Sequence, residues 1–290
     1  MIEIHFQRIE DATPFYQLIK KNLVSSQPDK TILLDEDRNI VVIMTNELPD
    51  DCFFELKKMF FDYILQIKCE DWFRALITEQ YFYTDEEEIR QILDIIHSIL
   101  EGEREDIAMF IKDIDIKAVL KHAVNHIMKK TISFSFDSFV KFSLRPFKDK
   151  LEKYVEISID EYKMEQEYQV FIQTLREFIS NRSPRLNSLH LLFDEEVIFF
   201  DEQFLEIKRI ELIKMIDRKL LFNHPVYVDS TTIAPLLSIA PQAIYVYSRE
   251  QDQPLIRTIR NIFEEKVLVD NVSVFEERRH LYSQIKKRIP

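Results

Sequence analysis

The chain has 290 residues, of which 46% are hydrophobic and 12% aromatic, and its formal net charge is −12. This apolar content excludes an intrinsically disordered chain, and the negative charge argues against a nucleic-acid partner because phosphate backbones would be repelled. The single glycine, Gly102, excludes a P-loop, a dinucleotide-binding fingerprint and a Gly-rich lid, since each of these needs several glycines.

The first 48 residues predict a small β-α-β-β unit. Its strands are expected at residues 1–7, 31–34 and 39–45. The first strand alternates apolar with polar residues, and the other two flank a polar turn that would make them a hairpin. The helix is expected to be capped by Asp11 or Thr13, with Pro14 in its first position and its end near Val24.

Residues 49–131 predict a helical region, because apolar residues recur at helical spacing. Helices are expected over residues 49–67, 70–79, 84–102 and 106–130, the last with an interruption near residues 113–115. Thr84 and Glu87 form a capping-box pattern at the start of the third helix, and Gly102 is expected to end it.

Residues 132–290 predict a long central helix followed by a mixed α/β unit. Residues 132–142 alternate apolar with polar side chains and predict one strand, or a tight hairpin bent at residues 137–138. The central helix is expected over residues 146–182, because this stretch has no glycine and no proline after its first residue. A helix of that length would measure about 50 Å, so we expect it to span subdomains or to kink near Ser158.

The sequence after the central helix alternates strands and helices. Strands are expected at residues 186–193, 197–200, 226–228, 243–248 and 267–269. Helices are expected at residues 203–220, 230–241 and 255–265, and from residue 276 to the end of the chain. The strand–helix–strand order indicates a βαβ crossover in a mixed sheet, so the predicted fold class is α+β and mostly helical.

His122 and His126 are the candidate metal ligands of the sequence. They are four residues apart on a predicted helix, which places both imidazoles on one face, where a third ligand from elsewhere could complete a site. The motif lacks the glutamate of HExxH, so a zinc hydrolase would have no general base here. Histidines at the surface or packed in the fold are the favoured interpretation, and the sequence predicts no cofactor. The isolated histidines His190 and His224 are expected to be structural.

Glu161 and Glu165 share one face of the central helix, as the carboxylates of a metal site in a helical bundle do. The Glu-x-x-His spacing of such sites is absent from this helix, so a solvated charged face is favoured. Cys52 and Cys69 fit no metal-binding spacing and indicate a reducing compartment. Because the sequence also has neither a signal-peptide pattern nor a long apolar run, we expect a cytoplasmic protein without membrane insertion.

Two stretches of the chain carry a family resemblance. The first contains FDSFVKF at residues 136–142, Glu161-Tyr162, EQEYQVFI at residues 165–172 and LREF at residues 175–178, and the second contains IAPLLSIAP at residues 233–241, Ala243-Ile244, Ile259 and Ile262-Phe263. Over residues 132–269 they resemble the YtxC-like family, the sporulation proteins of endospore-forming, Bacillus-type bacteria. The family pattern has glycine where Ser138 stands and often cysteines where Asp270 and Asn271 stand, so no metal or redox role based on such cysteines carries over.

The resemblance implies a cytoplasmic protein linked to sporulation and carries over no catalytic residue. We therefore expect a non-enzymatic protein that acts through contacts with a protein partner, with self-association into a homo-oligomer left open. The candidate contact residues on the central helix are Glu161, Glu165, Tyr168, Phe171 and Ile172. The alternative is a metal-dependent, hydrolase-like enzyme that uses His122, His126 and acidic residues of the central helix. Stoichiometric metal that disappears when both histidines are replaced by alanine would decide for this alternative.

Overall fold

The computed structural model describes residues 1–22, 31–44, 50–108, 110, 115–129, 132–217 and 231–288. Some predicted features lie outside these residues: the end of the first helix at Val24, residue 45, Pro49, the interruption at residues 113–114, residue 130, residues 218–220, His224, the strand at residues 226–228, and Ser230.

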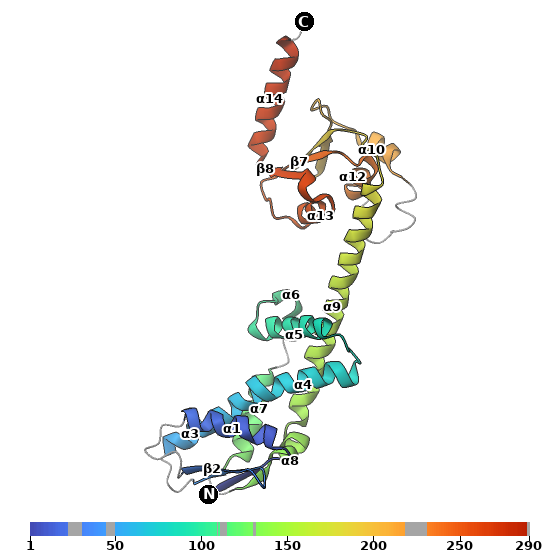
Figure 1. The fold of residues 1–290 in the computed structure, drawn as a ribbon. Helices are drawn as coiled ribbons and strands as arrows, with labels where there is room; N and C mark the ends of the chain where they lie inside the picture. Colours follow the sequence, from blue (N-terminus) through green and yellow to red (C-terminus); the bar gives the residue numbers. More distant parts are fainter. Residues whose placement is uncertain are drawn as a thin grey trace. The chain divides into compact units, whose positions relative to one another are not determined.

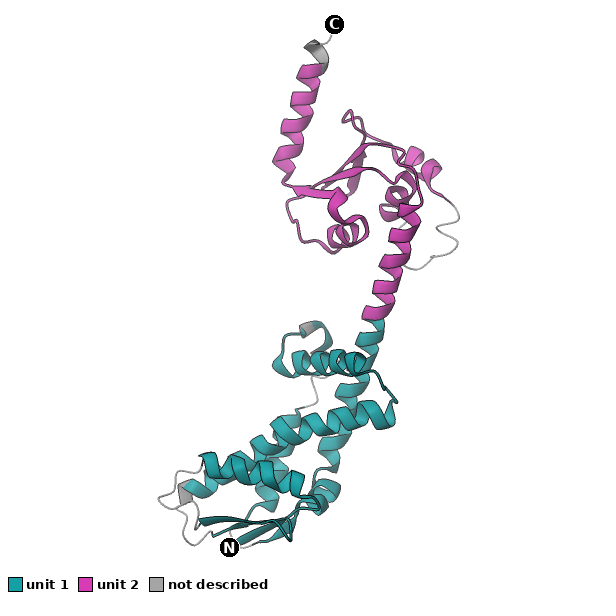
Figure 2. Ribbon diagram, viewed as in Figure 1, with its two compact units in different colours: residues 1–164 teal, residues 165–290 magenta. Residues whose placement is uncertain are grey.

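The chain forms two compact units, residues 1–164 and 165–290, and the division falls within the long helix α9 (Arg145–Ser180) (Figures 1 and 2). Helices dominate the described residues, and each unit holds one four-stranded mixed sheet. The predicted fold class, α+β and mostly helical with a long central helix, is confirmed. The predicted division into residues 1–48, 49–131 and 132–290 stays a prediction.

The sheet of the first unit has the strand order β2-β3-β1-β4. Its strands are β1 (Ile2–His5), β2 (Ile32–Asp35), β3 (Ile40–Ile43) and β4 (Phe134–Ser135). Strand β3 pairs antiparallel with β1 and β2, whereas β4 pairs parallel with β1. Ile2 and Ile4 are fully buried, as their alternation with polar residues predicts. The predicted first strand and the predicted hairpin are therefore confirmed.

The strand predicted over residues 132–142 is wrong beyond Ser135. The Ser135 hydroxyl accepts a hydrogen bond from a backbone N–H (3.2 Å) and so caps a helical turn, α8 (Phe136–Ser138). Phe136 and Phe139 are both buried, because helical spacing brings residues three apart to the same side. The aromatic residues of this stretch thus follow a helical period as well as the period of a strand.

Helix α1 (Ile9–Asn22) begins before the predicted capping residues, with Pro14 inside it and Asp11 buried in its first turn. The Asp11 backbone carbonyl accepts a hydrogen bond from the Tyr63 hydroxyl (2.7 Å), and an Asp11 carboxylate oxygen lies 2.7 Å from Lys68 Nζ. The predicted cap is wrong because Asp11 instead attaches α1 to the helices that follow the sheet.

The first unit continues with a series of helices. They are α3 (Asp50–Tyr63), a π-helical turn (Ile64–Lys68), α4 (Cys69–Ala75), a second π-helical turn (Leu76–Gln80), α5 (Glu86–Glu101), α6 (Glu105–Ala108), α7 (Ile116–Ile127) and, after α8, a third π-helical turn (Phe139–Ser143). The first four follow one another directly, so the predicted break before residue 70 is wrong. Helix α5 is capped by Asp85, which accepts two backbone N–H bonds (2.9 and 3.1 Å), and not by Thr84 as predicted. Gly102 ends it with a φ of 82°, as predicted.

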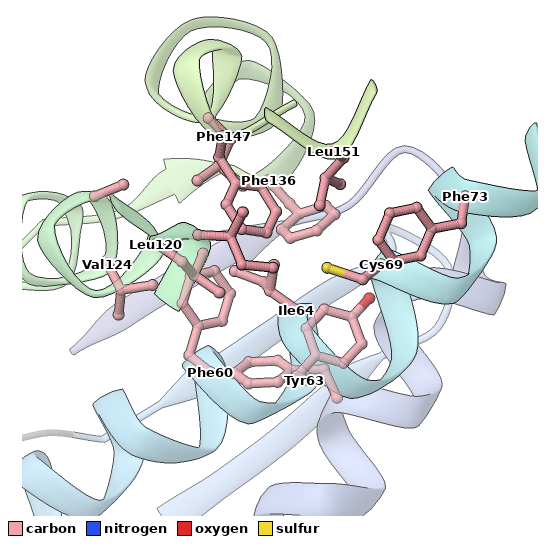
Figure 3. Close-up of a cluster of buried hydrophobic side chains, with 14 of the residues drawn as sticks. Phe60, Tyr63, Ile64, Cys69, Phe73, Leu120, Val124, Phe136, Phe147 and Leu151 are labelled. Atoms are coloured by element: carbon pink, nitrogen blue, oxygen red, sulfur yellow. The ribbon is translucent and has the colours of Figure 1, made fainter. Parts of the chain in front are cut away.

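Aromatic and aliphatic side chains from several helices fill the core of the first unit (Figure 3). The side chains labelled in Figure 3 are Phe60, Tyr63, Ile64, Cys69, Phe73, Leu120, Val124, Phe136, Phe147 and Leu151. The ring centroid of Phe60 lies 5.2 Å from that of Phe15 and 5.7 Å from that of Phe139. Ring pairs at these distances stabilise a core beyond the area that they bury. This packing includes Phe147 and Leu151, so it attaches the first turns of α9 to the first unit.

Ser158 of α9 has an unsatisfied hydroxyl: among the described residues, its Oγ is the buried side-chain polar atom without a hydrogen-bond partner. We expect the Ser158→Ala variant to gain about 1 kcal/mol in unfolding free energy, because a buried unpaired hydroxyl destabilises the native state. Ser98→Ala is the matched control, since Ser98 also lies inside a helix but donates to the Ile95 carbonyl (2.8 Å). Urea unfolding of both variants measures the difference, and a loss of stability in Ser158→Ala would contradict the prediction.

The sheet of the second unit has the strand order β6-β5-β7-β8. Its strands are β5 (Ser188–Phe193), β6 (Val197–Phe200), β7 (Ala243–Tyr247) and β8 (Val267–Asp270). Strand β7 pairs parallel with β5 and β8, and β6 pairs antiparallel with β5. Helix α13 (Pro254–Phe263) lies between β7 and β8 in the chain, which confirms the predicted βαβ crossover and mixed sheet.

The other helices of the second unit are α10 (Arg209–Met215), α12 (Ile233–Ile239) and α14 (Val272–Arg288). The helix predicted from Gln203 begins too early. Asp201 Oδ1 accepts hydrogen bonds from the N–H groups of Gln203 and Leu205 (2.8 and 2.9 Å), which folds this segment into a turn. The Ile207 N–H then bonds to the Phe199 carbonyl (2.8 Å), so the chain returns to β6 before α10 starts.

The two faces of the second sheet differ in composition. Leu189, Leu191, Ile244 and Val246 are fully buried on one face, where they pack with side chains of α9, α12 and α13. The opposite face is mostly aromatic and packs against α14. This second face holds the polar groups described next.

Candidate functional site

The aromatic face of the second sheet carries the candidate site. Strands β5 and β7 pair so that His190 lies beside Tyr245 and Leu192 lies beside Tyr247. Helix α14 packs on this face through Phe275, which is fully buried with its ring centroid 5.1 Å from that of Tyr247. From its contact with the sheet, α14 extends away from the strands (Figure 1). The helix therefore covers the aromatic face only in part.

A groove lies between this face and α14. We call it the α14 groove, and its lining residues are Ser188, His190, Phe204, Tyr245, Arg278, Leu281, Tyr282 and Ile285. Leu281 and Ile285 are one helical turn apart and are 59% and 50% exposed. These described lining residues include no acid, although the whole chain has a net charge of −12. The groove thus combines apolar surface, hydrogen-bonding groups and a cation.

His190 is the buried polar side chain of the α14 groove, with 5% of its surface exposed. Its Nδ1 lies 2.9 Å from the Tyr247 hydroxyl, and its ring stacks on Phe204 and Tyr245 with centroid distances of 4.2 and 5.0 Å. Burial lowers the pKa of His190 to about 4, and the positive charge of Arg278 acts in the same direction. The imidazole is therefore neutral at pH 7, where it serves as a hydrogen-bonding group and is a weak base.

Arg278 connects α14 to the sheet. Its Nη1 donates to the Tyr247 hydroxyl (3.1 Å), and its Nη2 lies 3.0 Å from Asp270 Oδ2. Its guanidinium carbon also lies 5.1 Å from the ring centroid of Tyr245, which is within cation–π range. These contacts hold a positive charge at the wall of the α14 groove.

The contact residues predicted on α9 fall into different environments. Glu161 is half-buried in the first unit and forms an ion pair with Arg104. Glu165, four residues later, is exposed. The two carboxylates thus share the helix face that the sequence predicts, but Glu161 is already engaged within its own unit.

The other three predicted contact residues belong to the second unit. Tyr168 is exposed, and its hydroxyl accepts a hydrogen bond from the Asn261 side chain (3.3 Å). Phe171 is half-buried against the second core, and Ile172 is buried inside it. A role of these residues in partner binding stays a prediction, and Glu165 and Tyr168 are the ones exposed to solvent.

His122 and His126 are both exposed on α7, where they line a shallow pocket with Ala118, Val119 and Pro146. The part of the chain that the structure describes contains no group of three or more His, Cys, Asp or Glu side chains placed to hold a metal ion. A metal site on α7 therefore stays a prediction without a third ligand.

His190 is predicted from the sequence to be structural, and its place in the site is missed. Its signal lies in the strands SLHLLF and AIYVYS, where polar and aromatic residues alternate with aliphatic ones. Alternation places Ser188, His190, Tyr245 and Tyr247 on one face, opposite the aliphatic core. Two neighbouring parallel strands with this alternation predict a sheet face that is polar and aromatic.

Comparisons with known proteins cover both units. The model of the YtxC-like family matches residues 54–268. The chain belongs to the YtxC-like family. It is similar to the Bacillus subtilis (strain 168) protein "Uncharacterized protein YtxC", with 34% identity over 268 residues, which cover 92% of this chain and 93% of that protein. No solved structure matches the chain. The predicted resemblance to the YtxC-like family is confirmed. A separate finding is that no described helix is long and apolar enough to span a membrane.

Proposed function

We propose that the chain is a cytoplasmic protein that acts in sporulation by binding a protein partner at the α14 groove, without catalysing a reaction. The sporulation role and the cytoplasmic location are what the resemblance to the YtxC-like family implies. The observation that carries partner binding is the exposure of Leu281 and Ile285 beside an aromatic sheet face. Neighbouring apolar side chains that remain exposed at a groove are typical of a surface that a partner covers.

The polar groups of the α14 groove suit binding better than catalysis. The Nδ1 atom of His190 is already bonded to Tyr247, and a pKa of about 4 leaves its imidazole a poor proton acceptor at neutral pH. Arg278 is held by Tyr247 and Asp270. Such fixed, hydrogen-bonded groups orient a bound segment.

The exposed part of α9 is a second contact surface in this proposal. Residues 165–170, which belong to the second unit, are all exposed, and they include the apolar side chain of Val170 (66%). Glu165 and Tyr168 lie in the same stretch and add polar groups to it.

A complementation experiment tests the proposed function. Bacillus subtilis cells that lack their YtxC protein would express this chain or its Leu281→Asp/Ile285→Asp variant during sporulation. We expect the unaltered chain to restore heat-resistant spores and to retain a cross-linked protein partner. The double variant is expected to retain at least about tenfold less of that partner, because two charges replace apolar contact surface.

The control is Ile213→Asp, which introduces a charge at an equally exposed position, 58% against 59% for Leu281, on α10 and away from the α14 groove. This control should behave like the unaltered chain. Normal sporulation in cells that lack YtxC would refute the sporulation role, and equal partner recovery by all forms would refute the groove as the contact site.

A further inference from the structure

The hydrogen-bond network around His190 fixes the position of its proton. Tyr247 is fully buried, and its hydroxyl oxygen accepts a bond from Arg278, since a guanidinium can only donate. Among the described residues, the remaining acceptor for the Tyr247 hydroxyl proton is His190 Nδ1, at 2.9 Å. Nδ1 therefore accepts, and the single proton of the neutral imidazole lies on Nε2.

This Nε2–H group is an unused donor in the α14 groove. The His190 side chain is more than nine-tenths buried and lines the groove, and its Nε2 has no partner among the described residues. Its neighbours Ser188 and Tyr245 also line the groove, and their hydroxyls likewise bond to nothing in the described part of the chain. None of these three groups is among the buried unsatisfied atoms of the described residues, so each is accessible from the groove, and this arrangement suits a ligand that supplies acceptor atoms.

The charge around the groove specifies the kind of acceptor. Arg278 lies in its wall, and the described lining residues include no acid that would repel an anion. Asp270, the carboxylate nearest to Arg278, is already paired with it. A carboxylate is therefore favoured over a neutral carbonyl, because its bonds to a cation are charge-assisted.

The apolar rim specifies what accompanies the carboxylate. Leu281 and Ile285 continue the groove along α14, about one and two helical turns beyond Arg278. A small carboxylate would leave these side chains exposed, whereas a peptide would cover them with the residues beside its acidic side chain.

We propose that the α14 groove binds an acidic peptide segment of a partner protein. A glutamate or aspartate of this segment bonds to Arg278 and to the Nε2–H of His190, and an adjacent apolar side chain packs against Leu281 and Ile285. This inference rests on the proposed function and names the chemistry of its partner.

Selection from a library of random short peptides on the full chain tests this inference. We expect the enriched peptides to share an acidic residue next to leucine, isoleucine or phenylalanine. One enriched peptide and its amide copy, with glutamine or asparagine in place of the acid, are then compared by fluorescence anisotropy. The amide copy is expected to bind about tenfold more weakly.

Variants of the chain connect this preference to the groove. Arg278→Gln should remove the discrimination between the acidic peptide and its amide copy, whereas Arg279→Gln removes the same charge outside the lining and should preserve it. Because Arg278→Gln also breaks two internal contacts, Leu281→Asp provides a second variant that leaves them in place. The Leu281→Asp substitution should weaken the binding of the acidic peptide at least about tenfold. Thermal unfolding confirms that each variant is folded.

The outcomes separate this inference from the proposed function. Enriched peptides that lack acidic residues but bind the Leu281→Asp variant more weakly than the unaltered chain would overturn the inference. They would leave partner binding at the groove intact. Enriched acidic peptides that bind Arg278→Gln as strongly and as selectively as the unaltered chain would overturn it too. Failure to enrich any peptide also overturns the inference, and the complementation experiment then decides on the proposed function alone.

Discussion

The Lys68→Met variant is expected to lose about 3–5 kcal/mol of the unfolding free energy of the first unit. Lys68 is 4% exposed, and its Nζ lies 2.7 Å from Asp11 Oδ1 and 2.5 Å from Asp71 Oδ2. When the Lys68 ammonium group is removed, the buried Asp11 carboxylate still has Arg8 as an ion-pair partner. The Arg8 side chain is mostly exposed, so its charge offsets the buried negative charge poorly. The single tryptophan, Trp72, lies in α4 near this cluster, so its fluorescence in urea reports on the first unit.

Two further variants isolate the buried charge. Lys58→Met removes an exposed lysine from α3 and is expected to change stability by less than about 0.5 kcal/mol. In the Asp11→Asn/Lys68→Met double variant the unpaired charge is gone, so its loss should be smaller than the sum of the two single losses. Additive losses, or a Lys68→Met variant as stable as the unaltered chain, would show that the ion pair does not hold α1 in place.

This ion pair also shows why the local sequence was not enough to predict the start of α1. Asp11 resembles a helix cap because it precedes Pro14, but its partner Lys68 lies 57 residues away. Nothing in the neighbourhood of Asp11 distinguishes a capping carboxylate from one that joins two helices. The start of α1 was therefore predicted too late.

The stretch FSFDSF illustrates a second limit, because its phenylalanines satisfy two periods at once. Phe134 and Phe136 alternate as in a strand, while Phe136 and Phe139 are spaced as in a helix. Strand β4 forms only where residues 134–135 pair with β1, about 130 residues earlier in the chain. That pairing is non-local, so the sequence around Phe136 could not indicate where the strand ends.

The second sheet was predictable because its signals are local. Alternation in β5 and β7 and the intervening helical patterns were enough to predict a mixed sheet with a crossover. The candidate site was not predicted, because it depends on the stacking of His190 against Tyr245 and Phe204 and on the Arg278 side chain from α14. These residues come from four separate segments, and their meeting is a product of the tertiary fold.

The same cluster leads to the expectation that the second unit loses stability as the pH falls from about 6.5 to about 4. The pKa of His190 is lowered from 6.5 to about 4, first by burial and then by Arg278, while Asp201 opposes the shift. Between these values the unfolded chain binds a proton that the folded chain excludes, so folding is favoured at the higher pH. The loss attributable to His190 is at most about 3.5 kcal/mol, since one pKa unit corresponds to about 1.4 kcal/mol.

The titration of His190 can be separated from that of other groups. The His190→Asn variant keeps an acceptor for the Tyr247 hydroxyl but cannot be protonated, so its stability should change less between pH 6.5 and pH 5, above the range where most carboxylates titrate. Amide hydrogen exchange of β5 and β7 measures the stability of the second unit alone, which matters because the chain has two units. The ring-proton shift of His190 should still report the neutral form at pH 5. The result would be contradicted if the His190 ring-proton shift had its midpoint near pH 6.5, or if the stability of the variant had the same pH dependence as that of the unaltered chain. Either outcome would mean that the imidazole is protonated in the folded state and that Nε2 is not held as the neutral donor of the groove.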